Sequence, residues 1–128
     1  MIDYLIEIKI EKFQNCLKSM FSAIPSFPHL PYESYYHSMI YMIMTLLGVK
    51  MDLEENTDQG RIDGVIEFDS IIYIIEFKLD KVQDAMKQIE DKKYYERYLK
   101  SNKKIILLGI GGFRDKNIEV LSEEIKSK

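Results

Sequence analysis

Two strand-like segments with only two residues between them constrain this chain more than any other feature. Residues 61–68 and 71–79 are rich in β-branched and aromatic side chains, and only residues 69–70 separate them. Such a short connection between two β-rich segments predicts an antiparallel hairpin with a two-residue loop. In that hairpin Phe68 faces Ile71, and this pair sets the register of both strands.

The register decides which polar side chains share a face of the hairpin. Counting back from the loop, Asp63 faces Glu76 and Arg61 faces Lys78. Because side chains alternate along a strand, Asp63, Glu76 and Lys78 project from one face, and the other face is apolar and forms core. A three-residue loop would shift the register by one residue and separate this group.

Two carboxylates directly opposite each other repel, and burial of this pair would raise the cost further. The flanking residues Ile74, Ile75 and Phe77 are apolar, which favours burial. A divalent cation such as Mg²⁺ or Mn²⁺ would relieve the repulsion, because these ions prefer carboxylate oxygens. The alternative is that Lys78 pairs with one carboxylate on a solvated face, as in many structural ion pairs.

The rest of the pattern predicts a mixed α/β domain that occupies the whole chain, residues 1–128. Expected helices cover residues 4–24, 33–48 and 80–101, and expected strands cover residues 49–55 and 104–110. The segment 36–47 is apolar almost all round, which predicts a buried helix. The tail beyond residue 116 fits either an edge strand or a short helix. We divide the domain into an N-terminal helix and Pro-rich connector (1–30), a core (31–113) and a C-terminal tail (114–128).

Composition excludes several classes of protein. Lys and Arg total 18 and Asp and Glu total 21, a net charge of −3, which argues against a protein that coats nucleic acid electrostatically. An enzyme that meets nucleic acid through a local patch and a metal ion remains compatible. The longest mostly apolar run, residues 39–49, is too short to span a bilayer. The single cysteine, Cys16, fits a reducing compartment, and we expect a cytoplasmic protein.

Asp63 followed by Glu76-Phe77-Lys78 at the end of an apolar strand resembles the motif of the PD-(D/E)XK nuclease superfamily. The resemblance is to the nuclease-like domain often found C-terminal to an AAA-ATPase-like domain in bacterial proteins. It covers about three quarters of the chain and is carried by residues 21–25, 36–41, 60–63, 74–80 and 104–110. It implies a restriction-endonuclease-like core, a small mixed β-sheet with a central hairpin, flanked by helices.

The resemblance also implies roles for the hairpin residues. Asp63 and Glu76 would bind Mg²⁺ or Mn²⁺ together with the backbone carbonyl of Phe77, and Lys78 would serve the attacking water. Asp63, Glu76, Lys78 and Gln88 are therefore our candidate catalytic residues.

In the RecB-like branch of the superfamily, a histidine on the early helix is a further metal ligand, and His37 occupies the comparable place. A lone histidine in an apolar helix is otherwise a core residue. Gln88 resembles a glutamine of the same branch, but its tyrosine partner, Tyr94, stands six residues on instead of four. Glu33 is an alternative acidic contributor from the His37 helix, although a first-turn glutamate also complements the helix dipole.

A basic segment with interleaved tyrosines follows Gln88. Our candidate nucleic-acid-binding residues there are Lys92, Lys93, Tyr94 and Arg97, with Tyr95 and Tyr98 as further rings that could stack on unpaired bases. The alternative is a solvated helical face, which such a run of charges commonly forms.

These observations favour a metal-dependent nuclease that hydrolyses phosphodiester bonds, with DNA favoured over RNA. The alternative is a catalytically inactive module that binds nucleic acid or a protein partner such as an ATPase-like domain. The chain has no G-x-x-x-x-G-K-[ST] motif, so an ATPase-like partner would lie outside these residues, as a neighbouring domain or as another protein. Many nucleases of this fold pair to cut two strands, but no residue pattern here marks a dimer surface.

Overall fold

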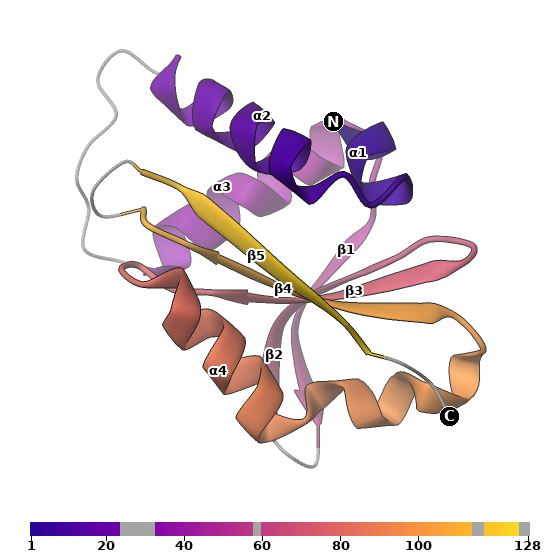
Figure 1. Cartoon of the computed structure of the whole chain (residues 1–128). Helices are drawn as coiled ribbons and strands as arrows, with labels where there is room; N and C mark the ends of the chain where they lie inside the picture. The colour runs from indigo at the N-terminus through magenta and orange to yellow at the C-terminus, as the bar shows by residue number, and fades with distance from the viewer. Residues whose placement is uncertain (24–32, 58–59, 114–116, 126–128) are drawn as a thin grey trace.

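A five-stranded mixed sheet with helices on both faces forms the domain (Figure 1). The computed structural model describes residues 1–23, 33–57, 60–113 and 117–125. The helices are α1 (Ile2–Ile6), α2 (Ile10–Ser22), α3 (Glu33–Leu46), α4 (Val82–Lys92) and the 3-10 helix η1 (Tyr94–Ser101). The strands are β1 (Met51–Thr57), β2 (Gly60–Glu67), β3 (Ile71–Phe77), β4 (Lys104–Gly111) and β5 (Glu119–Ile125). This α/β architecture is the restriction-endonuclease-like fold that the sequence predicts.

The strands lie in the order β1-β2-β3-β4-β5, and only β3 and β4 run parallel. The predicted hairpin is confirmed: Gly64 pairs with Ile75, and the Phe68 N–H donates to the Ile71 carbonyl over 2.8 Å. The loop therefore has two residues, and the predicted register is correct through these pairs.

Each face of the sheet carries its own core. α1, α2 and α3 cover one face, and α4 and η1 cover the other (Figure 1). All seven residues of β3 are buried because both faces of this central strand are covered. The core beneath α4, which we call the α4-side core, comprises Val65, Ile72, Ile74, Met86, Ile89, Ile105 and Leu107.

The prediction of one continuous helix over residues 4–24 is wrong, because α1 and α2 are separate helices. Ile8 has a φ of 58°, a left-handed conformation that ends α1. The Lys9 N–H then donates to the Tyr4 carbonyl over 2.7 Å, as in a Schellman cap. The apolar spacing continues through the break and therefore hides it from a periodicity analysis. The Pro-rich connector lies outside the described residues.

The predicted helix over residues 80–101 also divides in two. α4 ends at Lys92, Lys93 adopts a φ of 51°, and its N–H donates to the Ile89 carbonyl. η1 then carries the chain to the start of β4 beside β3. Leu99, near the end of η1, is 42% exposed.

The helix expected from Glu33 to Gly48 is confirmed, but its complete burial is not. α3 ends at Leu46, and Gly48 has a φ of 82°. Tyr36, Ile40 and Met44 are buried at helical spacing against the sheet. The opposite side of the helix exposes large apolar residues, namely Tyr41 (41%), Met42 (62%) and Leu46 (80%).

The C-terminal tail resolves into an edge strand. β5 pairs antiparallel with β4, so it extends the sheet beyond the expected core of residues 31–113. β4 ends at Gly111, and Gly112 has a φ of 80° that turns the chain. Within the described part of the chain, no helix is both long enough and apolar enough to cross a membrane.

Candidate functional site

The two hairpin carboxylates lie on the sheet face that α4 covers. Glu76 is only 3% exposed, and its neighbours on that face, Ile74 and Val65, belong to the α4-side core. The pairing of Gly64 with Ile75 continues toward Asp63 and Glu76. Asp63 is half-buried, and its Oδ2 accepts a hydrogen bond from the Phe77 N–H over 3.0 Å. Glu76 is therefore buried and does not form an ion pair on a solvated face.

Backbone geometry fixes the orientation of Asp63. The N–H and C=O of one strand residue point toward the same neighbouring strand. The Phe77 N–H points toward Asp63 on β2, so the Phe77 carbonyl belongs to the same side of β3. The next residue alternates: the Lys78 N–H donates to the Ile110 carbonyl on β4 over 2.9 Å. The hairpin thus holds one carboxylate oxygen of Asp63 against the backbone of Phe77, the residue that follows Glu76.

α4 brings Gln88 to the buried carboxylate. The Gln88 Nε2 donates a hydrogen bond to Glu76 Oε1 over 2.7 Å. This contact needs α4 close to the sheet, and Gly109, which pairs with Glu76, permits that approach. A Cβ at Gly109 would lie 2.9 Å from the Met86 Sδ and 3.2 Å from the Ala85 Cβ. Gln88 therefore orients a carboxylate oxygen in this structure.

Lys78 lines a pocket together with Gln88, the hydrogen-bond partner of Glu76. It follows β3 directly, is half-buried, and lines a pocket of about 450 Å³. The residues that line this pocket, which we call the Lys78 pocket, are Lys78, Asp84, Lys87, Gln88, Asp91 and Lys92. The hairpin residue Lys78 and the helix residue Gln88 thus line one pocket. The sequence analysis did not single out Lys87, Asp84 or Asp91, although their spacing from Gln88 places them on its helix face.

A second pocket, of about 550 Å³, lies at the start of α4. We call it the Asp80 pocket, and it is lined by Asp80, Lys81, Val82, Gln83, Asp84, Gly112, Asn117 and Glu119. Three carboxylates and one lysine give this lining an acidic balance. Asp84 lines both pockets, so the two adjoin at the first turns of α4.

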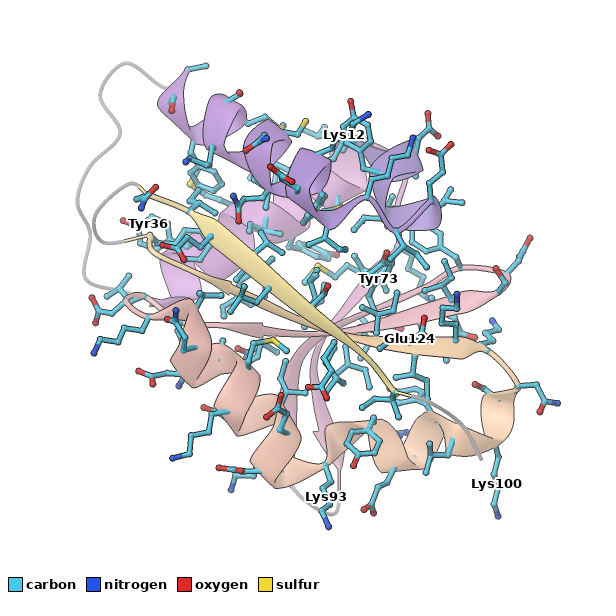
Figure 2. The ribbon with its side chains drawn as sticks, in the orientation of Figure 1. Lys12, Tyr36, Tyr73, Lys93, Lys100 and Glu124 are labelled. Carbon is cyan, nitrogen blue, oxygen red and sulfur yellow. The ribbon has the colours of Figure 1, made fainter. Side chains whose placement is uncertain are left out.

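The candidate nucleic-acid-binding residues lie in different environments. Lys92 lines the Lys78 pocket, and Lys93 is exposed at the turn between α4 and η1 (Figure 2). The Arg97 guanidinium lies 5.4 Å from the centre of the Tyr98 ring. Tyr98 is half-buried and packs against the α4-side core, so its ring contributes to the core. The Tyr94 side chain lies outside the described residues.

Tyr95 is likewise half-buried against the α4-side core. Part of each ring is therefore taken up by contact with the core, and the prediction that Tyr95 and Tyr98 stack on unpaired bases stays a prediction. The turn at Lys93 rotates η1 so that these rings face the sheet.

The carboxylates of Asp63 and Glu76 suit a hard divalent cation, since Mg²⁺ and Mn²⁺ take carboxylate and carbonyl oxygens. Within the described residues, no group of three or more His, Cys, Asp and Glu side chains is placed to hold a metal. A third protein ligand would therefore be a backbone carbonyl or an undescribed side chain. The side chains of His37 and Glu33 lie outside the described part of the chain.

Comparisons with known proteins agree with this geometry. A model of the PD-(D/E)XK nuclease superfamily matches residues 31–123. An uncharacterized protein in the vnfD 5′ region of Azotobacter chroococcum mcd 1 is 33% identical over 121 residues, which is 88% of this chain and 23% of that protein. The chain thus spans about a quarter of the length of that relative. The superfamily match covers α3, the whole hairpin, α4 and β4, and with them the carboxylate pair, so this chain belongs to the PD-(D/E)XK nuclease superfamily.

Proposed function

We propose that this protein is a metal-dependent nuclease that hydrolyses phosphodiester bonds, with DNA favoured over RNA. The observation that carries the proposal is the placement of Glu76. A carboxylate that is 3% exposed, on a strand next to Asp63 and at the edge of a lysine-lined pocket, is costly unless a cation uses it. Membership in the PD-(D/E)XK nuclease superfamily also supports phosphodiester hydrolysis. The fold by itself would not, because one fold can host many functions.

In this proposal Asp63, Glu76 and the Phe77 carbonyl hold Mg²⁺ or Mn²⁺. The ion would supply Lewis-acid charge that polarises the scissile phosphate and lowers the pKa of a bound water. The protein's contribution is to hold its oxygens in place. The Phe77 N–H orients Asp63, and the Gln88 amide orients Glu76. Such hydrogen bonds to ligand oxygens fix their direction and tune their affinity for the ion.

Lys78 acts on the substrate side of this arrangement. From the pocket mouth its ammonium neutralises a phosphate oxygen or orients the attacking water. Gln88 is a positioning residue in this scheme, because the contact it makes is with Glu76. We further propose that His37 contributes a metal ligand, as in the RecB-like branch.

The test is cleavage of a labelled panel of single- and double-stranded DNA and RNA with Mg²⁺, Mn²⁺ or EDTA. Metal-dependent cleavage is expected for the wild type and is expected to disappear in Glu76→Ala. Lys78→Met should keep Mn²⁺ binding, measured as a rise in melting temperature, and should lose cleavage. Cleavage at the normal rate by either variant would contradict the proposed roles.

A non-catalytic binding module is the second candidate, and one observation favours it. The outer side of α3 exposes large apolar side chains, among them Met42 at 62% and Leu46 at 80%. Exposed apolar clusters of this kind often mark protein interaction sites. The relative's greater length is compatible with a neighbouring domain, such as an ATPase-like one, and the exposed side of α3 with a dimer. An absence of any melting-temperature shift at millimolar Mn²⁺ would favour this candidate.

The single cysteine supports the further proposal that the protein works in the reducing cytoplasm. The same panel of substrates can be tested in reducing buffer without loss of a disulfide, since Cys16 is a free thiol in the structure.

A further inference from the structure

The Lys78 pocket follows one face of α4 for more than two helical turns. Asp84, Lys87, Gln88, Asp91 and Lys92 lie three or four residues apart, which places them in a row on the helix surface. Lys78, at the end of β3, contributes to the lining from the sheet. The pocket is therefore an elongated surface next to the carboxylate pair, with Gln88 as the residue that touches both.

Two lysines of this pocket have no part in holding the carboxylates. Lys87 and Lys92 are exposed and lie on either side of Gln88 along the helix. Two other lysines of this half of the protein are engaged in ion pairs. Lys103 contacts Glu67, and Lys104 lies 3.4 Å from a carboxylate oxygen of Glu124. Lys87 and Lys92 instead present their charges to the pocket.

The two pockets along α4 differ in the charge of their linings. At the N-terminal end of the helix, the adjoining Asp80 pocket is lined by Asp80, Asp84 and Glu119. A nucleic-acid backbone carries a phosphate charge at every nucleotide, and these carboxylates would repel it. In the Lys78 pocket, Lys78, Lys87 and Lys92 outnumber Asp84 and Asp91, so this lining would attract the backbone. A strand bound at the carboxylate pair is therefore directed along the Lys78 pocket and away from the Asp80 pocket.

We propose that Lys87 and Lys92 bind the backbone phosphates adjacent to the one that is cleaved. The substrate strand then runs along the Lys78 pocket, past Lys87 and Lys92, and avoids the Asp80 pocket. This inference rests on the proposed function, because that function identifies the ligand as a nucleic-acid strand. It adds a direction to the site: the strand follows the pocket with three lysines and turns away from the pocket with three carboxylates.

The competing explanation for Lys92 is structural, because a lysine in the last turn of a helix stabilises the helix dipole. That role predicts a lower melting temperature in Lys92→Ala and no change in the number of phosphate contacts. Phosphate contacts are counted by salt dependence, since each contact releases counterions from the nucleic acid. The two explanations therefore predict different slopes of log affinity against log salt concentration for the variant.

The experiment measures binding of a fluorescein-labelled single-stranded DNA oligonucleotide in EDTA, where no cleavage is expected. Wild type is compared with the Lys87→Ala/Lys92→Ala double variant and with a Lys12→Ala control. Lys12 lies on α2, on the opposite side of the sheet from Lys93 and Lys100 (Figure 2). All three proteins keep Asp63 and Glu76, so any repulsion from these carboxylates is common to them.

Loss of two contacts should reduce the slope of log affinity against log salt by about 1.4 for a single strand. Between about 50 and 200 mM salt, wild type should then lose roughly sevenfold more affinity than the double variant. The Lys12→Ala slope should match wild type. Equal slopes for wild type and the double variant would overturn the inference, as would binding too weak to detect in wild type.

Failure of the proposed function is detected separately. If wild type binds with the expected slope difference and cleaves nothing with Mg²⁺ or Mn²⁺, the nuclease assignment fails and the phosphate-binding surface stands. If wild type cleaves and Glu76→Ala does not, while the slopes are equal, the nuclease assignment stands and the inference about Lys87 and Lys92 fails.

Discussion

Replacement of Tyr73 by Phe should change the alkaline stability of the protein in a way that can be calculated. Tyr73 is completely buried on the face that α1, α2 and α3 cover, and its hydroxyl donates to the Leu5 carbonyl (Figure 2). Burial raises the pKa of the Tyr73 phenol from 10.0 to about 12. The folded state therefore keeps the phenol proton at pH values where the unfolded chain has lost it.

The sign follows from proton linkage. Below pH 10 both states carry the proton, and the contribution of Tyr73 is fully present. As pH rises from about 10 to about 12, the unfolded state binds fewer protons than the folded state, so the free energy of unfolding falls. A shift of two pKa units corresponds to a loss of about 2.7 kcal/mol, at 1.36 kcal/mol per unit.

Tyr73→Phe removes both the hydrogen bond and the titration. At pH 8 the variant should be less stable by about 1 kcal/mol, the usual value of one hydrogen bond. The Leu5 carbonyl still accepts the Ile8 N–H over 3.3 Å, which keeps this cost small. The free energies of unfolding of the two proteins should become equal near pH 10.7, where the linkage loss in wild type equals the cost of the missing hydrogen bond. Above that pH, Tyr73→Phe should be the more stable protein.

Urea unfolding of both proteins at several pH values from 8 to 11.5 measures this crossing. Other tyrosines and lysines titrate in the same range, but they are common to both proteins and cancel in the difference. Curves that stay parallel across the whole range would refute the reasoning, because they would mean that Tyr73 titrates alike in the folded and unfolded states.

Three further predictions concern α4 and its contacts. Gln88→Leu should weaken Mn²⁺ binding about 10- to 100-fold in a calorimetric titration, because Glu76 loses its orienting amide; unchanged affinity would contradict this. Gly111→Ala should cost about 1–3 kcal/mol in urea unfolding, since its Cβ would lie 2.7 Å from the backbone nitrogen that begins α4; an unchanged midpoint would argue against that contact. The Glu123 carboxyl hydrogen-bonds to Glu90 and raises the pKa of Glu90 above its ordinary 4.5, so wild-type stability falls as pH rises through that raised pKa. Glu123→Gln should show a smaller fall in melting temperature over that range, and an equal fall would exclude the coupling.

The candidate site was predicted from the sequence where local rules determine it. A two-residue loop fixes hairpin register, and alternation along strands then puts Asp63 and Glu76 on one face. Both rules act over a few residues, so no knowledge of the rest of the fold was needed. The environment of Lys92 and the roles of Lys87 and Asp84 could not be predicted, because they depend on how α4 is placed against the sheet.

The sequence by itself determined the elements whose signal is local: the hairpin and its register, the extent of α3, and the buried strand β4. Tertiary structure alone decided the rest. α4 and η1 separate at Lys93 because the chain must return to lay β4 beside β3, and the break turns Tyr95 and Tyr98 toward the core. Gln88 reaches Glu76 because Gly109 lets α4 approach the sheet. Periodicity describes which face of a helix is apolar, but only packing sets what the polar face touches.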